Sequence, residues 1–221
     1  LSIVVYPRLP VEQIPMLSLA TGVAVAEALA QHFGLQARLK WPNDVLVRGR
    51  KIAGILLESR IGAPPGAGIA ESAAPREGST DVSTRRTSPR PPTAGAGLTD
   101  PVTIIGIGLN LAQRAFPGAL AGLATSVLLE TGRSVDREAT LEALLAGFDR
   151  WRACLEGEGF GPVRSRWVAL SETIGRTVSA SGTTGVAIDL DLDGALIVVD
   201  GARCHRIASG EIVEGDNAPR R

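Results

Sequence analysis

The chain has 221 residues, with 23 lysines and arginines against 23 aspartates and glutamates. This even balance produces no overall field, so composition predicts neither a nucleic-acid partner nor binding to an anionic membrane. The uncharged stretch from Gln13 to Ala26 is shorter than the roughly 18 apolar residues expected of a spanning helix. No secretory signal is recognisable. Cys154 and Cys204 lack CxxC spacing, so we expect no disulfide framework or zinc site, and a cytoplasmic location.

The first part of the chain alternates strand and helix patterns. Residues 1–6, LSIVVY, predict an apolar strand that ends before two prolines. Residues 17–33 place apolar side chains at helical intervals, and Gly34 follows as the expected cap. A strand over residues 36–40 then leads into the next segment.

Residues 40–58, KWPNDVLVRGRKIAGILLE, predict a β-hairpin. Its first strand is residues 45–47, and residues 48–50 form the turn. Residues 52–57 are a continuous apolar run, and this lack of alternation predicts a strand covered on both faces. We therefore expect the charged side chains that flank this run to lie at the edge of a buried strand.

Residues 60–101 hold 7 of the 14 prolines and no aromatic side chain. This composition predicts a disordered insertion. Its arginines at 85, 86 and 90 either dock an acidic partner or belong to a solvated loop between two strands.

Residues 102–111, VTIIGIGLNL, predict a strand interrupted by Gly106 and Gly108. Glycines inside a strand mark a place where a ligand or another backbone approaches closely. Tight packing against the first helix explains them equally well. Asn110 can donate and accept hydrogen bonds at a ligand, or cap a turn.

The last part of the chain predicts two helices and a set of short strands. Asp136 is the expected N-cap of one helix, and residues 162–172 form the other. The strands expected after residue 175 are 177–181, 185–190, 195–199 and 203–207, with Asp-Gly turns between them. Strands of this length and spacing indicate a small barrel over residues 175–221, after a larger domain over residues 1–174.

Three blocks in this order resemble the biotin protein ligase family, which includes biotin–[acetyl-CoA-carboxylase] ligases and holocarboxylase synthetase. The blocks are KWPND at 40–44, KIAGIL at 51–56 and GIGLNL at 106–111. The resemblance implies an α+β fold of the class II synthetase-like kind, in which helices pack on a mixed sheet. It also implies that the C-terminal strands form an SH3-like β-barrel, with GEI at 210–212 as the closing motif.

The resemblance implies a two-step ligation. Biotin reacts with ATP, in the presence of Mg²⁺, to give biotinyl-5'-AMP and pyrophosphate, and the biotinyl group then passes to a lysine of a biotin carboxyl carrier domain of a carboxylase. A homodimer is compatible with the family, and the residues present indicate no membrane or nucleic-acid partner. Two other hypotheses are a truncated, inactive relative that acts as a ligand-binding module, and an acyl ligase of the lipoate type.

The resemblance also implies the site residues. These are Lys51 and Asp44 for catalysis, Lys51, Gly54 and Gly106 for biotin, and Lys40, Asn43 and Asn110 for the nucleotide. Asp44 either accepts a proton from the acceptor lysine or helps to hold Mg²⁺; an exposed turn carboxylate paired with a lysine is the alternative. For Lys51 the alternative is a side chain that reaches from a strand end into solvent.

One part of the family pattern is not found in this sequence. The family's phosphate-binding loop of GRGRxGR type, and the strands that line the biotin pocket, precede the KWPND block. We therefore expect that the chain, which opens on Leu1, is N-terminally truncated and incomplete for activity by itself. A DNA-binding helix-turn-helix, present in bifunctional members, would also lie upstream.

Overall fold

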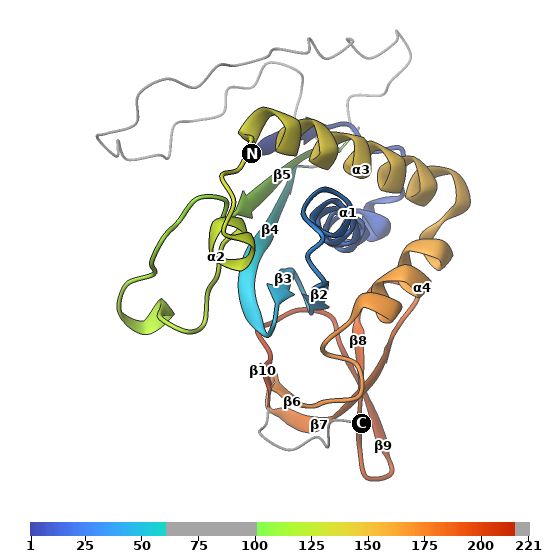
Figure 1. The fold of residues 1–221 in the computed structure, drawn as a ribbon. Helices are drawn as coiled ribbons and strands as arrows, with labels where there is room; N and C mark the ends of the chain where they lie inside the picture. The colour runs from blue at the N-terminus through green and yellow to red at the C-terminus, as the bar shows by residue number, and fades with distance from the viewer. Residues whose placement is uncertain (61–100, 215–221) are drawn as a thin grey trace, which may run out of the picture.

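The computed structural model describes residues 1–60 and 101–214, drawn in colour in Figure 1. The insertion expected at 60–101 therefore lies almost wholly outside the described residues. The strands are β1 (Ser2–Val5), β2 (Ala37–Lys40), β3 (Asp44–Val47), β4 (Arg50–Arg60), β5 (Val102–Leu109), β6 (Thr177–Ala180), β7 (Thr183–Leu190), β8 (Leu196–Asp200), β9 (Arg203–Ile207) and β10 (Val213–Glu214). The α-helices are α1 (Met16–Phe33), α2 (Val127–Thr131), α3 (Arg137–Glu158) and α4 (Phe160–Leu170), with short 3₁₀ turns at Val11–Gln13 and Gly118–Leu120.

The N-terminal sheet has the strand order β1-β5-β4-β3-β2. Every pair of neighbouring strands in it is antiparallel, so the mixed sheet expected from the family resemblance is not observed. The reason lies in the connections, because β2, β3 and β4 follow one another through tight turns, and such turns can join only antiparallel strands. Parallel pairing between described residues occurs only as two isolated bridges, Leu39 with Ser171 and Lys51 with Ala124.

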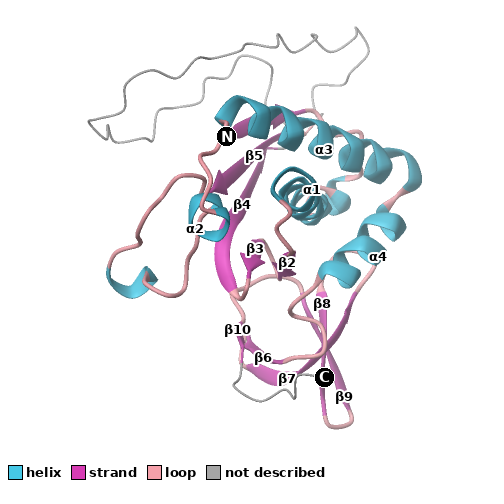
Figure 2. Cartoon of the chain, viewed as in Figure 1, coloured by secondary structure: helices cyan, strands magenta, loops and turns pink. Residues whose placement is uncertain are grey.

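The helical layer covers one face of this sheet, with α1 innermost and α3 and α4 against it (Figure 2). Small residues allow the close approach of α1 and α3, since a Cβ at Gly147 would lie 3.4 Å from the carbonyl oxygen of Ala24. As expected, α1 ends at Gly34, whose φ of 69° is left-handed and whose N–H donates to the carbonyls of Ala30 and Leu29.

The segment Val11–Phe33 is long and apolar enough to cross a membrane, although the sequence suggested a shorter apolar stretch. Within the fold, 72% of its most apolar part is buried among other elements. This burial is what a central core helix requires, and α1 fills that place.

The expectation that residues 52–57 are covered on both faces is wrong. Ile52 and Ile55 are at most 2% exposed, and Ile55 faces α1, because a Cβ at Gly22 of that helix would lie 3.9 Å from Ile55 Cδ1. Leu56, on the opposite face, is 61% exposed. Among the described residues, no helix covers that second face, so a continuous apolar run here forms a strand with one buried and one open side. Gly54 also lies on the open side.

The C-terminal strands form a second antiparallel sheet, in the order β10-β6-β7-β8-β9. No pairing among the described residues joins β9 to β10, so the expected SH3-like barrel is not closed. Strand β10 comprises Val213 and Glu214, the last of the described residues, and it pairs with β6. The predicted N-cap of α3 is confirmed, because the Asp136 side chain accepts from the N–H groups of Glu138 and Ala139.

Candidate functional site

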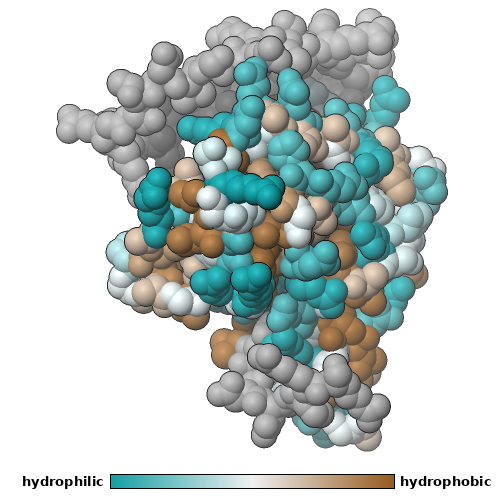
Figure 3. All heavy atoms as spheres, viewed as in Figure 1, coloured by the Kyte–Doolittle hydropathy of each residue, from teal (hydrophilic) through white to brown (hydrophobic). Residues whose placement is uncertain are grey.

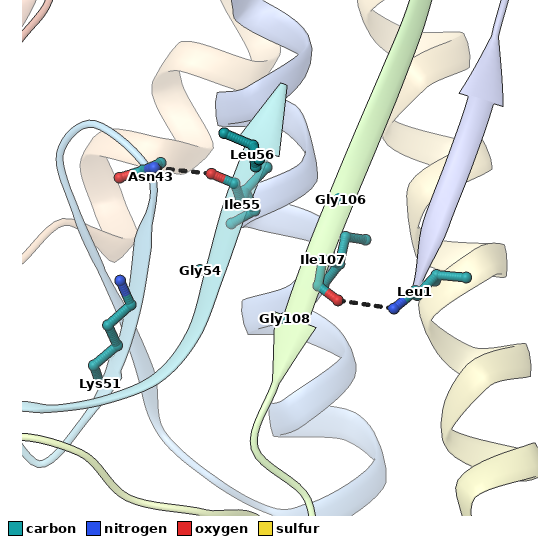
Figure 4. Close-up of a pocket in the computed structure, with 9 residues that line it drawn as sticks. All are labelled: Leu1, Asn43, Lys51, Gly54, Ile55, Leu56, Gly106, Ile107 and Gly108. Atoms are coloured by element: carbon teal, nitrogen blue, oxygen red, sulfur yellow. Dashed lines mark hydrogen bonds between the residues drawn. The ribbon is translucent and has the colours of Figure 1, made fainter. Parts of the chain in front are cut away.

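Two neighbouring pockets open on the uncovered side of the N-terminal sheet. The first has a volume of about 430 Å³ and is lined by Leu1, Asn43, Lys51, Gly54, Ile55, Leu56, Gly106, Ile107 and Gly108 (Figure 4). The second, of about 310 Å³, is lined by Lys40, Trp41, Pro42, Asn43, Asp44, Lys51, Gly210, Glu211 and Ile212. Asn43 and Lys51 line both pockets, so they lie at the junction between them.

An ion pair stands at this junction. Lys51 Nζ lies 2.5 Å from Asp44 Oδ1, and the two side chains are 49% and 23% exposed. A glycine makes room for the pair, because a Cβ at Gly54 would lie 3.1 Å from Lys51 Cε and 3.2 Å from Lys51 Nζ. The ammonium is therefore held near a carboxylate while it stays accessible to a ligand.

A β-bulge determines where Lys51 lies on its strand. Ala53 pairs with Val45 and Lys51 pairs with Leu46, so Ile52 is an extra residue in the ladder. Bulges of this kind change the direction of a neighbouring side chain and are common beside active sites. Here the bulge places Lys51 beside the pockets while Ile52 stays buried.

Asn43 fastens the KWPND turn to β4. Its side-chain Nδ2 donates to the carbonyl of Ile55 over 2.8 Å, and the N–H of Ile55 donates back to the Asn43 carbonyl over 2.9 Å. Figure 4 shows the side-chain bond beside the first pocket, where Lys51 extends toward Asn43. The Oδ1 atom of Asn43 remains as the side-chain group able to accept from a ligand.

Trp41 connects the site to the C-terminal sheet. It is 2% exposed, its backbone N–H donates to Thr173 Oγ1 over 3.0 Å, and its indole Nε1 donates to the carbonyl of Gly194 over 3.1 Å. Gly194 lies in the turn between β7 and β8 of the C-terminal sheet. Residues 210–212, which lead into β10 of that sheet, line the second pocket. Both sheets therefore build the second pocket.

Comparison with known proteins agrees with these features. Residues 1–70 match the Biotin/lipoate A/B protein ligase family. The biotin–[acetyl-CoA-carboxylase] ligase of Paracoccus denitrificans is 35% identical over 208 residues, which are 90% of this chain and 72% of that protein. The chain belongs to the biotin protein ligase family. A bifunctional ligase/repressor BirA from Bacillus subtilis is 28% identical over 221 residues, and the chain spans 58% of its length.

Solved structures of this family have the same fold. The biotin protein ligase of Aquifex aeolicus in complex with biotin and ATP superposes with a TM-score of 0.69 at 22% identity, covering 97% of this chain and 76% of that one. A biotin protein ligase-like protein of unknown function from Silicibacter superposes with a TM-score of 0.65 at 14% identity, covering 93% of this chain and 76% of that one. The described architecture is thus that of biotin protein ligases.

The structure brings together most of the residues that the family resemblance placed at the site. Lys51, Gly54 and Gly106 line the first pocket, and Lys40, Asn43 and Asp44 line the second, with Asn43 and Lys51 in both.

Asn110 lies outside the lining of both pockets. Its side-chain Nδ2 donates to the carbonyl of Thr125 over 3.1 Å, and its backbone N–H donates to the carbonyl of Ile52 over 2.9 Å. In this ligase fold Asn110 therefore links β5 to the segment before α2, and contact with a nucleotide stays a prediction.

The sequence reasoning missed four contributors to the site. Leu1 and Leu56 add apolar side chains to the first pocket, Ile107 lines it from β5, and Glu211 adds a second carboxylate to the lining of the second. The GEI motif signalled a family match at residues 210–212, but its position beside Lys40 depends on how the two sheets pack. The exposure of Leu56 also depends on tertiary structure, because helices cover only one face of β4.

Proposed function

We propose that this chain activates biotin with ATP to form biotinyl-5'-AMP and transfers the biotinyl group to a lysine of a biotin carboxyl carrier domain. The observation that supports it most is the pair of pockets joined at Lys51. The reaction needs two substrates to meet at one cationic point, and the two pockets provide a place for each. Family membership with a biotin–[acetyl-CoA-carboxylase] ligase supports the same activity.

In the first step, a carboxylate oxygen of biotin attacks the α-phosphorus of ATP and pyrophosphate leaves. Both reactants are anions, so the reaction requires cations and fixed donors that offset their repulsion. Lys51 meets this need at the junction, and Lys40 lines the second pocket where the phosphates would lie. The first pocket is lined by Leu1, Leu56 and strand glycines, which suits an apolar acyl chain and a flat ring system.

In the second step, the ε-amine of the carrier lysine attacks the acyl carbon of the adenylate, and AMP leaves. The amine must lose a proton, and Asp44 is the carboxylate paired with Lys51 at the junction. When Lys51 turns from Asp44 toward the anionic substrate, Asp44 becomes available to accept that proton.

The donor set of the second pocket fits a magnesium ion that arrives with ATP. Magnesium is usually held by one or two carboxylates together with substrate phosphates rather than by a complete protein cage. Asp44 and Glu211 are the carboxylates of this lining. Among residues 1–60 and 101–214, no group of three or more His, Cys, Asp or Glu gathers into a metal site.

The test uses the complete gene product, including any sequence that precedes Leu1. The protein is incubated with biotin, ATP, Mg²⁺ and a carrier domain, and the carrier is weighed by mass spectrometry. We expect a carrier heavier by one biotinyl group, and no change when the carrier's acceptor lysine is replaced by arginine. An unmodified carrier, with biotin still bound by the protein, would instead support the ligand-binding module.

The same assay separates biotin from lipoate. We expect lipoic acid in place of biotin to leave the carrier domain unmodified. Modification by lipoate at a comparable rate would overturn the assignment to biotin and support the lipoate type of ligase.

A further inference from the structure

Glu130 is a buried carboxylate close to the site but outside both pockets. It lies on α2, and its side chain is 0% exposed. Arg50 Nη2 lies 2.6 Å from Glu130 Oε1, and Thr125 Oγ1 donates to the same oxygen over 2.6 Å. Arg48 Nη1 lies 3.6 Å from the other oxygen, Oε2, which has no hydrogen-bond partner within the described structure. A buried carboxylate with this set of partners requires a reason, since burial of a charge is unfavourable unless it is paired.

Two partners of Glu130, Arg50 and Thr125, connect it to Lys51. Arg50 directly precedes Lys51 on β4. Thr125 is joined to its backbone, because the Thr125 N–H donates to the Lys51 carbonyl over 2.9 Å. The Lys51 N–H in turn donates to the carbonyl of Leu123 over 2.8 Å. The backbone of Lys51 is thus held on both sides by residues 123–125, and Glu130 holds Thr125 and Arg50.

The hairpin turn supports the same interpretation. Arg48 has a φ of 52° and Gly49 a φ of 73°. Left-handed backbone is unfavourable for an arginine, and Gly, Asn or Asp are the residues usual in such a turn. The arginine at this position points a second positive charge at Glu130, although its side chain is 76% exposed.

Residues 110–131 also carry exposed apolar side chains, which makes an anchor for this segment necessary. Leu120, Leu123 and Leu129 are 45–65% exposed, and apolar residues gather over α2 and the segment before it in the view of Figure 3. The hydrophobic effect therefore contributes little to holding Leu123 against β4. Val127 of α2 is fully buried, but residues 120–124 depend on polar contacts, and Glu130 provides two of them through Thr125 and Arg50.

We propose that Glu130 is a positioning residue for Lys51. Through Thr125 and Arg50 it fixes residues 123–125 against the bulged strand, and this fixes the direction in which the Lys51 ammonium points. The proposal rests on the proposed function for its catalytic consequence, whereas the attachment itself is a property of the fold.

The test is Glu130→Gln in the complete gene product, with two measurements. Hydrogen exchange reports on the attachment, and the amides of Lys51 and Thr125 should exchange at least about tenfold faster while those of α1 and β5 stay protected. Biotin-dependent pyrophosphate release reports on the chemistry, and its kcat should fall about 10- to 100-fold, as expected for a misplaced catalytic group. Arg48→Gln should show a smaller change in both, because its contact is longer and more exposed.

Glu27→Gln is the matched control, because Glu27 is another largely buried carboxylate with two arginine partners, on the helical side of the fold. It should leave both the Lys51 amide and kcat unchanged below the unfolding temperature. Unchanged exchange at Lys51 and Thr125 in Glu130→Gln, or a uniform rise that includes α1, would overturn the proposal. Locally faster exchange in a protein whose wild type releases no pyrophosphate would leave the attachment established and contradict the proposed function instead.

Discussion

The two faces of the N-terminal sheet are made by the same strands but differ in how far their side chains and backbone are exposed. Toward α1, the side chains of Ile55, Ile105 and Ile107 are at most 5% exposed. On the other face, Gly54, Gly106 and Gly108 leave the backbone accessible, and Leu56 is 61% exposed. The covered face supplies the burial that stabilises the fold. The open face exposes apolar surface and holds an ion pair beside it, which are the features that the proposed binding of biotin requires.

The largest effect that separates the two faces is expected from Lys51→Ala. Loss of the ammonium should lower biotin-dependent pyrophosphate release by about 100- to 1000-fold, the range for removal of one charge-stabilising group. Stability should change little, because the Lys51 side chain is 49% exposed. Steady-state kinetics beside thermal unfolding gives both quantities. Turnover near that of the wild type would leave Lys51 as a solvated side chain at a strand end.

A smaller effect on the open face is expected from Gly54→Ala. The added Cβ would lie 3.1 Å from Lys51 Cε, so the lysine side chain must move. A displacement of a catalytic group by a fraction of an ångström to about 1 Å lowers turnover by about 10- to 100-fold. Gly157→Ala in α3 is the control, because no atom lies within 4 Å of its added Cβ. That variant should keep full turnover. Equal turnover in both variants would show that Gly54 is not required for space around Lys51.

On the helical side of the fold, a substitution is expected to lower folding stability and not turnover, and Glu27→Gln tests this. Glu27 accepts from Trp151 Nε1 over 2.9 Å and pairs with Arg150 and Arg166 over 2.5 and 2.8 Å. Burial raises the pKa of Glu27, but the hydrogen bonds from Trp151 and Arg166 and the charges of Arg166 and Arg150 lower it by more, so the pKa lies below its ordinary 4.5. The substitution should cost about 1–3 kcal/mol of stability at neutral pH.

The pH dependence of this loss has a definite sign. Because the folded-state pKa of Glu27 is lowered, its contribution is complete above the ordinary pKa of 4.5 and disappears as the pH falls through the lowered value. Urea unfolding of wild type and variant between pH 7 and about pH 3 should therefore show two stabilities that converge on acidification. A difference that stays constant over this range would contradict the assigned role of the charge.

The smallest effect on stability is expected from shortening the connection between β4 and β5. Arg60 pairs with Val102 across the two strands, so a short turn can join them. Replacing residues 62–98 by a few glycines and serines should shift the unfolding midpoint by no more than a few degrees, because loop length contributes only weakly to stability. Differential scanning calorimetry measures the shift. A larger fall would mean that the replaced residues stabilise the sheet.

Local patterns in the sequence predicted the elements of both faces. The apolar period of α1, the left-handed cap at Gly34 and the N-cap at Asp136 each depend on residues a few positions apart, and all three are confirmed. The glycines of β5 marked a close approach, and the structure places Gly106 beside a pocket.

Features that depend on distant contacts could not be predicted in this way. The apolar run of β4 does not reveal which of its faces a helix will cover, so the exposure of Leu56 was missed. Closure of the C-terminal strands depends on whether the two edge strands, β9 and β10, pair with each other, and no such pairing occurs among the described residues. The hold of residues 123–125 on Lys51 joins positions more than 70 residues apart, and no periodic signal accompanies such a contact.

The most direct test of the account is a crystal structure of the complete gene product with biotin. We predict biotin in the first pocket, with its carboxylate about 2.7–3.2 Å from Lys51 Nζ and its body against Gly54 and Gly106. Lys51 should then have turned away from Asp44. Biotin bound elsewhere, or bound in this pocket with Lys51 still paired to Asp44 and out of reach of the carboxylate, would contradict the account.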